Sequence, residues 1–495
     1  AVVRARRWDV VVVILALGAL GFLNRWDLPT FTALFFAVLL LRAFQVRASG
    51  RPVRFKELGG LMAVVLAGAG ILYLPFYLFF DSQAAGILPV REAMTRQIHY
   101  VLIWGPFLLL NLSLLAALAW SAFREPVRRW ALRQLGAAEV DGEPPDPPDG
   151  ARRRWLASPA LWAIVLPLVP FALWGGVQFG IGVYEGSIGG GVLSIGSRFW
   201  HLLPLLLILS IGLGLLFRKA AREGRASAPV QFVLLLMLFA FLLTMGSELF
   251  RIVDLFNNRM NTVFKFYYQA WALLAIGGAF SLYYWGSRRA GLGLVGRWGW
   301  SALMGLFVIV IAASLLFVPT AAYSKAQRFE PSPTLDGLSA YRARWPGEYA
   351  AVQWLRREAD AGAVIVEAVP LGADGRPHGD YDPSVSRISS ITGLPAILGW
   401  PGHEHQWRGD PFEPIAQRAR DVDTIYRSED REQARRTMQR YDVTYVIVGD
   451  LERRTYGREV DERFAAFMDI AFQSDGVVIY TNRESSAGQR ISRVR

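Results

Sequence analysis

The sequence predicts a multi-span α-helical membrane domain of about nine helices over residues 1–320, followed by a small extracytoplasmic α/β domain over residues 321–495. Three observations support this prediction. The composition is 53% hydrophobic with a mean hydropathy of +0.28, too apolar for an ordinary soluble protein. Arginine-rich loops alternate with loops that hold fewer basic residues. After residue 320, helical patterns alternate with β-rich runs.

Nine apolar segments are long enough, or nearly so, to cross a hydrocarbon layer of about 30 Å. The first, fifth and sixth of them are short. The segments lie at residues 9–23, 28–44, 58–80, 99–121, 159–174, 202–217, 229–247, 264–286 and 299–320.

The arginine-rich loops predict the orientation in the plasma membrane. They lie at residues 1–8, 45–57, 122–158, 218–228 and 287–298. The positive-inside rule places these loops and the amino end in the cytoplasm, and the carboxyl-terminal domain outside. Much of the net charge of +12 sits in such loops, and the basic residues are not interleaved with aromatics, so we expect no nucleic-acid partner. The chain has no cysteine, which excludes disulfides and thiolate metal sites.

Three further loops carry structural predictions. Residues 81–97 are predicted to form an amphipathic helix at the membrane surface. The glycine-rich residues 175–201 indicate a flexible loop. Residues 143–150, with their dense proline and aspartate, are typical of an extended linker.

The carboxyl-terminal domain is predicted to be a three-layer α/β unit with a mainly parallel sheet, because helical and strand patterns alternate. The predicted helices are residues 348–359, 429–441 and 462–472, and the predicted strands are 363–369, 443–449 and 476–481.

Residues 248–271 hold the densest polar group among the apolar segments. Charges at a membrane boundary are costly to desolvate, so they tend to mark sites or their supports. Lys265 is one of only four lysines among the 53 basic residues, which indicates a use for its compact ammonium. A solvated loop with a snorkelling lysine is the alternative. The polar side chains include Glu248, Arg251, Asp254, Arg259, Asn261, Lys265 and Tyr267.

Asp27 lies in the short loop between the first two apolar segments, and Pro29 follows it. The pair fits a helix cap with proline in the first turn, and it equally fits a functional carboxylate at the outer boundary.

A second dense stretch, residues 387–409, lies between the first two predicted strands and contains His403, Glu404, Trp407 and Arg408. A His-x-His pair without a third ligand is a weak metal signal. Glu404 and Arg408 fit a structural ion pair, with Trp407 as a core anchor. The alternative, which we favour, is that Trp407 stacks on a sugar while the polar groups hold its hydroxyls or a phosphate.

Several separated motifs resemble those of the YYY integral-membrane family of bacteria and archaea. They are RMNTVFKFYYQAW, NRWDLPTF, TLDGL with VIVEAV, RISSITGLPAILGWPGHEHQWRG and YDVTYVIVGDLERRTY. That family has no assigned function and is described as glycosyltransferase-like, similar to the GT-C class. The resemblance implies an enzyme that passes sugar from a polyprenyl-phosphate carrier to a glycan or protein acceptor on the outer side. The family's tyrosine triplet is absent, since Tyr267–Tyr268 is only a pair. We therefore expect an amino-terminal portion, with a further carboxylate, to be missing or to lie on a separate polypeptide.

These interpretations assign roles. A carboxylate is needed to accept the acceptor's proton, and cations are needed to hold the carrier phosphate. The predicted catalytic residues are Asp27, Glu248 and Asp254; the phosphate ligands are Arg259 and Lys265; the substrate-binding residues are Asn261, Tyr267, His403, Glu404, Trp407 and Arg408. No metal ligand is assigned, and the cofactor is left open, with a divalent metal compatible. The alternatives are a transporter or flippase of lipid-linked glycans and a structural subunit with a partner-binding outer domain.

Overall fold

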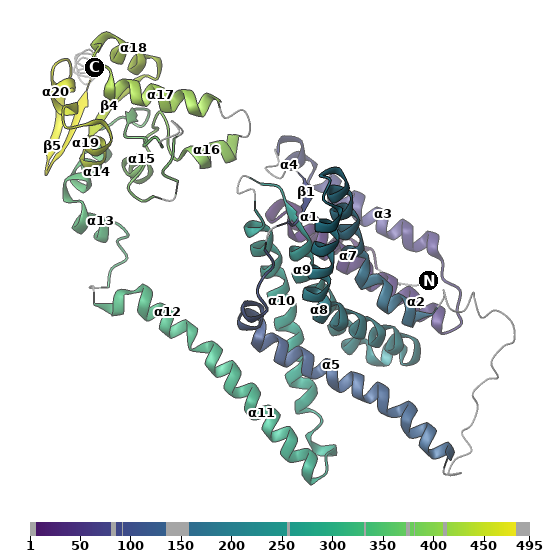
Figure 1. The fold of residues 1–495 in the computed structure, drawn as a ribbon. Coiled ribbons are helices and arrows are strands. Elements are labelled where there is room, and N and C mark those ends of the chain that lie inside the picture. Colours follow the sequence, from purple (N-terminus) through teal and green to yellow (C-terminus); the bar gives the residue numbers. More distant parts are fainter. Residues whose placement is uncertain are drawn as a thin grey trace. The chain divides into compact units, whose positions relative to one another are not determined.

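The computed structural model divides the chain into two compact units, Ala1–Ala322 and Tyr323–Arg495 (Figure 1). The residues that it describes are 6–80, 86–91, 93–134, 158–254, 258–330, 333–372, 377–380, 382–408 and 413–481, without the side chains of 125–134, 290 and 406–408.

The first unit is built from helices. They are α1 (Arg7–Leu23), α2 (Asp27–Ala48), α3 (Phe55–Leu72), α4 (Leu74–Phe79), α5 (Gln97–Gln134), α7 (Pro159–Tyr184), α8 (Ile188–Arg222), α9 (Ala228–Leu249), α10 (Met260–Gly286), α11 (Leu294–Leu315) and α12 (Phe317–Lys325). Short 3₁₀ turns, η1 (Gly224–Ser227) and η2 (Arg289–Gly291), join α8 to α9 and α10 to α11.

Every predicted apolar segment coincides with a helix, but fewer of them qualify as membrane spans than expected. Among the described residues, 7 helices are long and apolar enough to cross a membrane. The two others are α1, which has only 17 residues, and α10, which has 27 residues but carries polar side chains along its length. The predicted linker at residues 143–150 lies outside the described residues.

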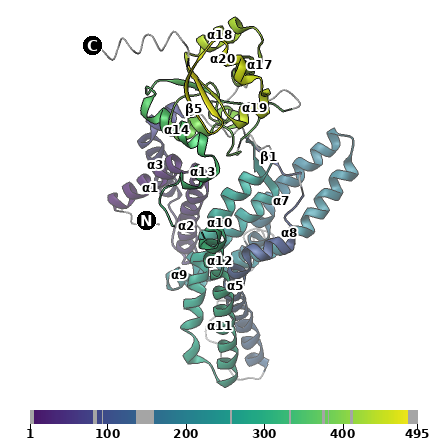
Figure 2. The same cartoon turned by 90° about the vertical axis from the view of Figure 1, so that its left-hand side faces the viewer.

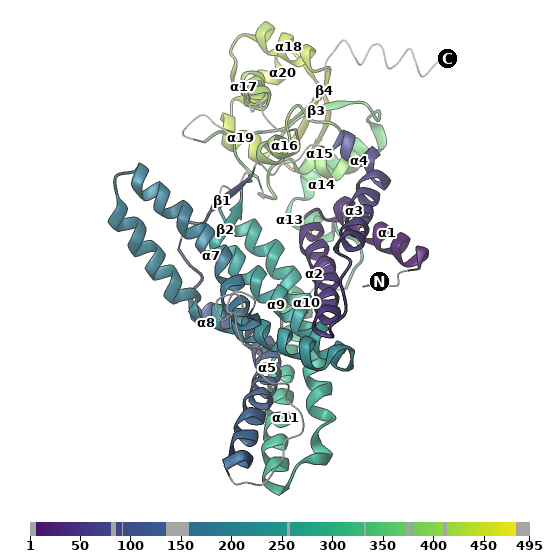
Figure 3. The ribbon, with the colours of Figure 1, turned by 90° about the vertical axis from the view of Figure 1, so that its right-hand side faces the viewer.

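The predicted glycine-rich loop at residues 175–201 is wrong, because most of it is helical. α7 continues to Tyr184 and α8 begins at Ile188, so the two form a helical hairpin, visible in Figure 3. Its glycines allow close packing: a Cβ at Gly182 would lie 3.4 Å from the Cα of Gly191. Small residues that let helix backbones approach are a common packing device in membranes. The helices are about 39 and 52 Å long, more than the hydrocarbon thickness.

The predicted surface helix at residues 81–97 is also wrong. Residues 87–89 form a short strand, β1 (Ile87–Pro89), which pairs antiparallel with β2 (Phe250–Ile252). The backbone groups of this segment therefore bond to the chain that follows α9, and α5 begins only at Gln97. This pairing brings together two loops that are far apart in the sequence.

Buried polar side chains connect the helices of this unit. The Gln45 amide on α2 donates to the Gln231 side chain on α9 over 2.7 Å. Asn111 on α5 donates to the Leu274 carbonyl on α10 over 3.0 Å. Gly277 is required beside it, because a Cβ there would lie 2.2 Å from the Asn111 side-chain oxygen. Such hydrogen bonds between helices fix their register where water is absent.

The second unit contains a four-stranded sheet with helices around it, shown in Figure 2. Its strands are β3 (Val364–Val366), β4 (Val443–Val448), β5 (Asp469–Ser474) and β6 (Val477–Thr481). Its helices are α13 (Ser339–Arg344), α14 (Pro346–Glu358), α15 (Arg387–Thr392), α16 (Pro401–Arg408), α17 (Glu413–Arg427), α18 (Arg431–Arg440), α19 (Asp450–Tyr456) and α20 (Val460–Ala465), and a 3₁₀ turn, η3 (Gln327–Phe329), precedes them.

The sheet is mixed, not mainly parallel as predicted. The strand order is β3-β4-β6-β5, in which only β3 and β4 are parallel. The error lies in the predicted helix at residues 462–472, because the structure assigns its last four residues to β5, which runs from Asp469 to Ser474. The hairpin turn after β5 uses Asp475 and Gly476, both at positive φ. Asp-Gly between two strand-forming runs is a strong hairpin signal, and the helical interpretation overlooked it.

Alternate residues of the central strand point to opposite faces of the sheet. Tyr445 and Ile447 pack in one apolar cluster with α14, whereas Val446 and Val448 pack in another with α17 and α18. The predicted fold class, membrane helices followed by a small α/β region, is therefore confirmed.

The orientation of the chain stays a prediction, and it has a direct test. Because the chain has no cysteine, single cysteines at Ala151 and Ser474 give unambiguous labels. We expect an impermeant thiol reagent to label the Ser474 variant on intact cells, and the Ala151 variant only after permeabilisation. If only the Ala151 variant were labelled on intact cells, the topology would be the inverse of the predicted one.

Candidate functional site

Glu248 is the centre of a buried polar cluster near the end of α9. Its side chain is 5% exposed and forms an ion pair with Arg259, with Oε1 and Nη1 2.7 Å apart. Thr95 donates to it twice, from its backbone N–H over 3.1 Å and from its hydroxyl over 2.5 Å. A carboxylate at a helix C-terminus opposes the helix dipole, so these donors and Arg259 are needed to hold it there.

Three arginines lie in this part of the unit, and one of them, Arg259, pairs with the carboxylate. Arg259, with 15% of its side chain exposed, also donates from Nη2 to the Ala93 carbonyl over 2.8 Å. Arg198 of α8 is buried, donates to the Glu248 carbonyl and lies 4.8 Å from the Trp174 ring. Arg251 on β2 is buried as well. These contacts connect α8, the end of α9, the start of α10 and the chain before α5.

A polar stripe follows one face of α10. Its members, Asn261, Lys265 and Gln269, are spaced four residues apart and therefore share a face. Asn261 donates to Asp254 over 2.9 Å, and Gln269 donates to the Trp26 carbonyl over 3.0 Å. The stripe thus runs for about 12 Å from Asp254 toward the start of α2.

Lys265 lies at the middle of this stripe and is half-buried. Its ammonium is 5.6 Å from the Phe264 ring, a cation–π contact. Asp27, the residue after Trp26, is the first residue of α2. It is not the cap, because Trp26 occupies that position without a side-chain cap bond. A carboxylate in the first turn still interacts favourably with the helix dipole.

Tyr267 lies on another face of α10 from Lys265. Its ring meets Trp104 of α5 edge-on, with centroids 5.0 Å apart. Its hydroxyl is buried, and its side chain interacts with Thr95 and Trp104.

A cleft of about 180 Å³ opens between α5 and α8 next to the Glu248 cluster. Its walls are apolar, and include Val101, Leu108 and Leu205. Its polar end is formed by Thr95, Gln97, His201 and Glu248, with Gln97 donating to the His201 carbonyl over 2.9 Å. The cleft therefore combines an apolar trough with a polar end, an arrangement suited to an amphipathic molecule.

The other predicted substrate residues lie on α16 in the α/β unit. His403 Nδ1 is 3.2 Å from an oxygen of Asp380, and its ring lies 5.1 Å from that of Trp400. Glu404 accepts from the Gly399 N–H over 2.8 Å, a contact that stabilises the start of this helix. The side chains of Trp407 and Arg408 lie outside the described residues. Sugar binding at α16 stays a prediction.

We assign no residue of the chain to metal binding. Across the described ranges, no three histidine, aspartate or glutamate side chains are grouped as metal ligands would be.

The sequence indicated Glu248, Asp254, Arg259 and Asn261 but not their pairing. It missed Thr95 and the residues of the cleft, because these lie on segments that appeared to be a surface helix and an ordinary span. A threonine or glutamine in such a segment carries no signal until β1 and β2 bring the two loops together.

These features define a multi-pass membrane protein with a polar site at one end of its helices and a separate α/β unit. The chain belongs to the family described as uncharacterised membrane protein (DUF2298), whose model matches residues 2–274. That range ends within α10 and includes the Glu248 cluster, the stripe and the cleft. No curated protein and no solved structure matches the chain.

Proposed function

We propose that the protein is a membrane glycosyltransferase that uses a polyprenyl-phosphate-linked sugar donor on the extracytoplasmic side of the plasma membrane. The observation that supports this most is the cleft between α5 and α8. Its apolar walls suit an isoprenoid chain, and its polar end lies beside the Glu248 cluster. The motif resemblance to the YYY family and its GT-C-like architecture points the same way.

The stripe on α10 supplies the groups that transfer requires. In the reaction, an acceptor hydroxyl oxygen attacks the anomeric carbon, and the bond from that carbon to the phosphate oxygen breaks. The acceptor's proton passes to a carboxylate, and negative charge accumulates on the departing polyprenyl phosphate. Lys265 is the cation that we assign to this phosphate, because its ammonium has no carboxylate partner among the described residues.

Of the predicted bases, we assign proton acceptance to Asp254 or Asp27, at the two ends of the stripe. Glu248 already accepts from Thr95 and Arg259, so we assign it the role of positioning the loop. Arg259 contributes positive charge near the phosphate while its guanidinium anchors the same loop. Asn261 orients Asp254, and Tyr267 stays a predicted substrate-binding residue.

Replacing Lys265 with methionine tests the phosphate assignment. Methionine keeps much of the side-chain length and removes the charge. Loss of charged hydrogen bonds is expected to weaken binding of a short-chain polyprenyl phosphate by about tenfold or more. Binding to the purified protein is measured in detergent, together with its melting temperature. Lys56→Met is the matched control, since Lys56 is exposed at the start of α3.

The outcomes separate the candidate functions. A lower melting temperature without a binding defect would make Lys265 a structural residue. Turnover is measured as the release of labelled sugar from its polyprenyl phosphate. Asp27→Asn or Asp254→Asn is expected to abolish this release, while the variant still binds the polyprenyl phosphate. Carrier binding without any sugar release by the native protein would favour the flippase alternative.

A further inference from the structure

An arginine-lined pocket lies in the α/β unit at the edge where the parallel strands β3 and β4 end. Open α/β sheets commonly bind ligands at the carboxyl ends of their strands. The pocket has a volume of about 630 Å³, and four of its lining residues are arginines: Arg387, Arg453, Arg454 and Arg458. Trp345, Asp450 and Asp461 complete the lining. Two carboxylates face four guanidinium groups, so the pocket is positively charged.

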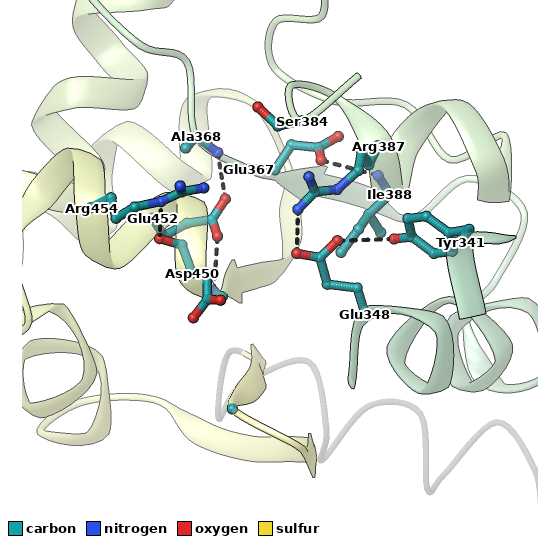
Figure 4. Close-up of polar contacts among 12 residues, drawn as sticks. Tyr341, Glu348, Glu367, Ala368, Ser384, Arg387, Ile388, Asp450, Glu452 and Arg454 are labelled. Atoms are coloured by element: carbon teal, nitrogen blue, oxygen red, sulfur yellow. Dashed lines mark hydrogen bonds and ion pairs between the residues drawn. The ribbon is translucent and has the colours of Figure 1, made fainter. Parts of the chain in front are cut away.

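Arg387 is held in place by its neighbours. Only 8% of its side chain is exposed, and Nη2 donates to Glu348, which also accepts from the Tyr341 hydroxyl over 3.1 Å. The Trp345 ring lies 4.6 Å from the guanidinium carbon. Figure 4 shows the guanidinium turned toward Glu348, with Glu452 and Arg454 both on α19 nearby.

One hydrogen-bond donor of the buried Arg387 has no acceptor in the described part of the chain. Its Nε–H finds no acceptor among the described residues, and neither does the buried hydroxyl of Ser386, the preceding residue. A buried donor without an acceptor costs about 1–3 kcal/mol, so such groups usually have a partner. Ser386 also has a φ of 55°, an uncommon conformation for serine. Of these two residues Arg387 lines the pocket, and its unsatisfied Nε–H indicates that the pocket receives a ligand with acceptor oxygens.

Of the remaining arginines in the pocket, one is held rigidly and two are free to adjust their side-chain conformation. Arg453 is fixed by Asp461, with Nε and Nη2 2.6 and 2.9 Å from its two oxygens. Arg454 and Arg458 are exposed, and no ion pair is found for either among the described residues. A planar guanidinium group can donate two parallel hydrogen bonds to two oxygens of one phosphate or carboxylate, which makes arginine a preferred ligand for both anions.

We propose that the α/β unit binds an anionic sugar, one whose ring carries a phosphate or a carboxylate, in this arginine-lined pocket. The arginines hold the anion, and the half-buried Trp345, whose ring already contacts the guanidinium groups of Arg344 and Arg387, contributes an aromatic edge to the pocket wall. The volume is in the range of small-ligand sites. The proposal does not rest on the transferase activity, because the pocket belongs entirely to the α/β unit, which the family model does not reach.

Calorimetry with the full chain in detergent tests the proposal with four probes: glucose 1-phosphate, glucuronate, glucose and inorganic phosphate. We expect one of the two anionic sugars to bind at least about tenfold more tightly than glucose and phosphate. The preferred one identifies the anion as phosphate or carboxylate. The double variant Arg454→Ala/Arg458→Ala is expected to lose at least about tenfold in affinity for it.

The control is Arg431→Ala/Arg436→Ala on α18, which removes the same charge from exposed positions that do not line the pocket. It is expected to bind like the native protein, and melting temperatures verify that each variant is folded. Equal affinities in the two double variants would overturn the pocket assignment. The pocket would be a phosphate site and not a sugar site if inorganic phosphate bound as tightly as glucose 1-phosphate and glucuronate did not bind. The proposal would also be wrong if neither anionic sugar bound at millimolar concentration.

Discussion

Replacing Arg259 with methionine is expected to destabilise the membrane unit by about 3–5 kcal/mol, the effect of breaking a buried ion pair on one side. The variant leaves the Glu248 carboxylate, 5% exposed, with Thr95 as its remaining donor. Because Arg259 also bonds to Ala93, the loop that carries β1 loses a second attachment. The free energy of unfolding is measured by titrating the purified protein from mild detergent into a denaturing one and following helical circular dichroism.

The matched control is Arg91→Met. Arg91 pairs with Glu185 over 2.9 Å, but both side chains are about half exposed, at 56% and 44%. Removing an exposed pair of this kind changes stability by about 1 kcal/mol or less. A double-mutant cycle adds Glu248→Leu: if the pair is coupled, the double variant loses less than the sum of the two single variants. Equal losses for Arg259→Met and Arg91→Met would show that the buried pair contributes no more than a surface pair.

This prediction separates the residues of the site that stabilise the fold from those that are candidates for binding substrate. The charges of residues 248–271 indicated a functional region from sequence, and several of them now have structural partners: Glu248 with Arg259, and Asp254 with Asn261. Lys265 differs, since its ammonium contacts the Phe264 ring. A charge in a polar stretch is therefore not evidence for catalysis by itself. The structure supplies the contacts that distinguish an anchor from a candidate ligand.

Local pattern was enough to locate the apolar helices of the first unit, and in the second unit α14, α18 and three of the four strands of the sheet, because apolar periodicity reports burial directly. It did not locate α13, α15, α16, α17 or α19. It failed where tertiary pairing decides the structure. Residues 87–89 form a strand only because residues 250–252 lie beside them. Glycines at 175–201 appeared to break helices, yet Gly182 and Gly191 serve helix packing.

The arginine-lined pocket illustrates the same limit. Arg387 begins the dense stretch at residues 387–409 and Arg453 lies in one of the motifs quoted for the resemblance, but their residue types alone fit surface charges equally well. They meet because β3 and β4 are parallel neighbours, so the segments that follow them, carrying α15 and α19, leave the sheet at one edge. Only strand order reveals this meeting.

Glu452, beside that pocket, is expected to make the α/β unit less stable as pH rises from about 5 to 8. It is buried and accepts from the Ala368 and Gly449 N–H groups over 2.9 and 2.8 Å. Burial raises the pKa of its carboxyl from 4.5 to about 7. The folded state therefore holds a proton that the unfolded chain releases near pH 4.5. The contribution is fully present below that pH and is lost as pH rises through 7, for a total of up to about 3 kcal/mol.

Hydrogen exchange at the Ala368 amide in the full chain measures this effect, with protection corrected for the intrinsic pH dependence of exchange. Glu452→Gln keeps an acceptor oxygen but does not ionise, so its protection is expected to vary much less between pH 5 and 8. Burial also raises the pKa of Glu367, so a residual slope of the same sign is expected in that variant. Glu462→Gln, at an exposed position on α20, is the control and is expected to keep the native slope. A native slope in Glu452→Gln would mean that this carboxyl is ionised in the folded unit throughout the range, and that its two backbone donors compensate for its burial.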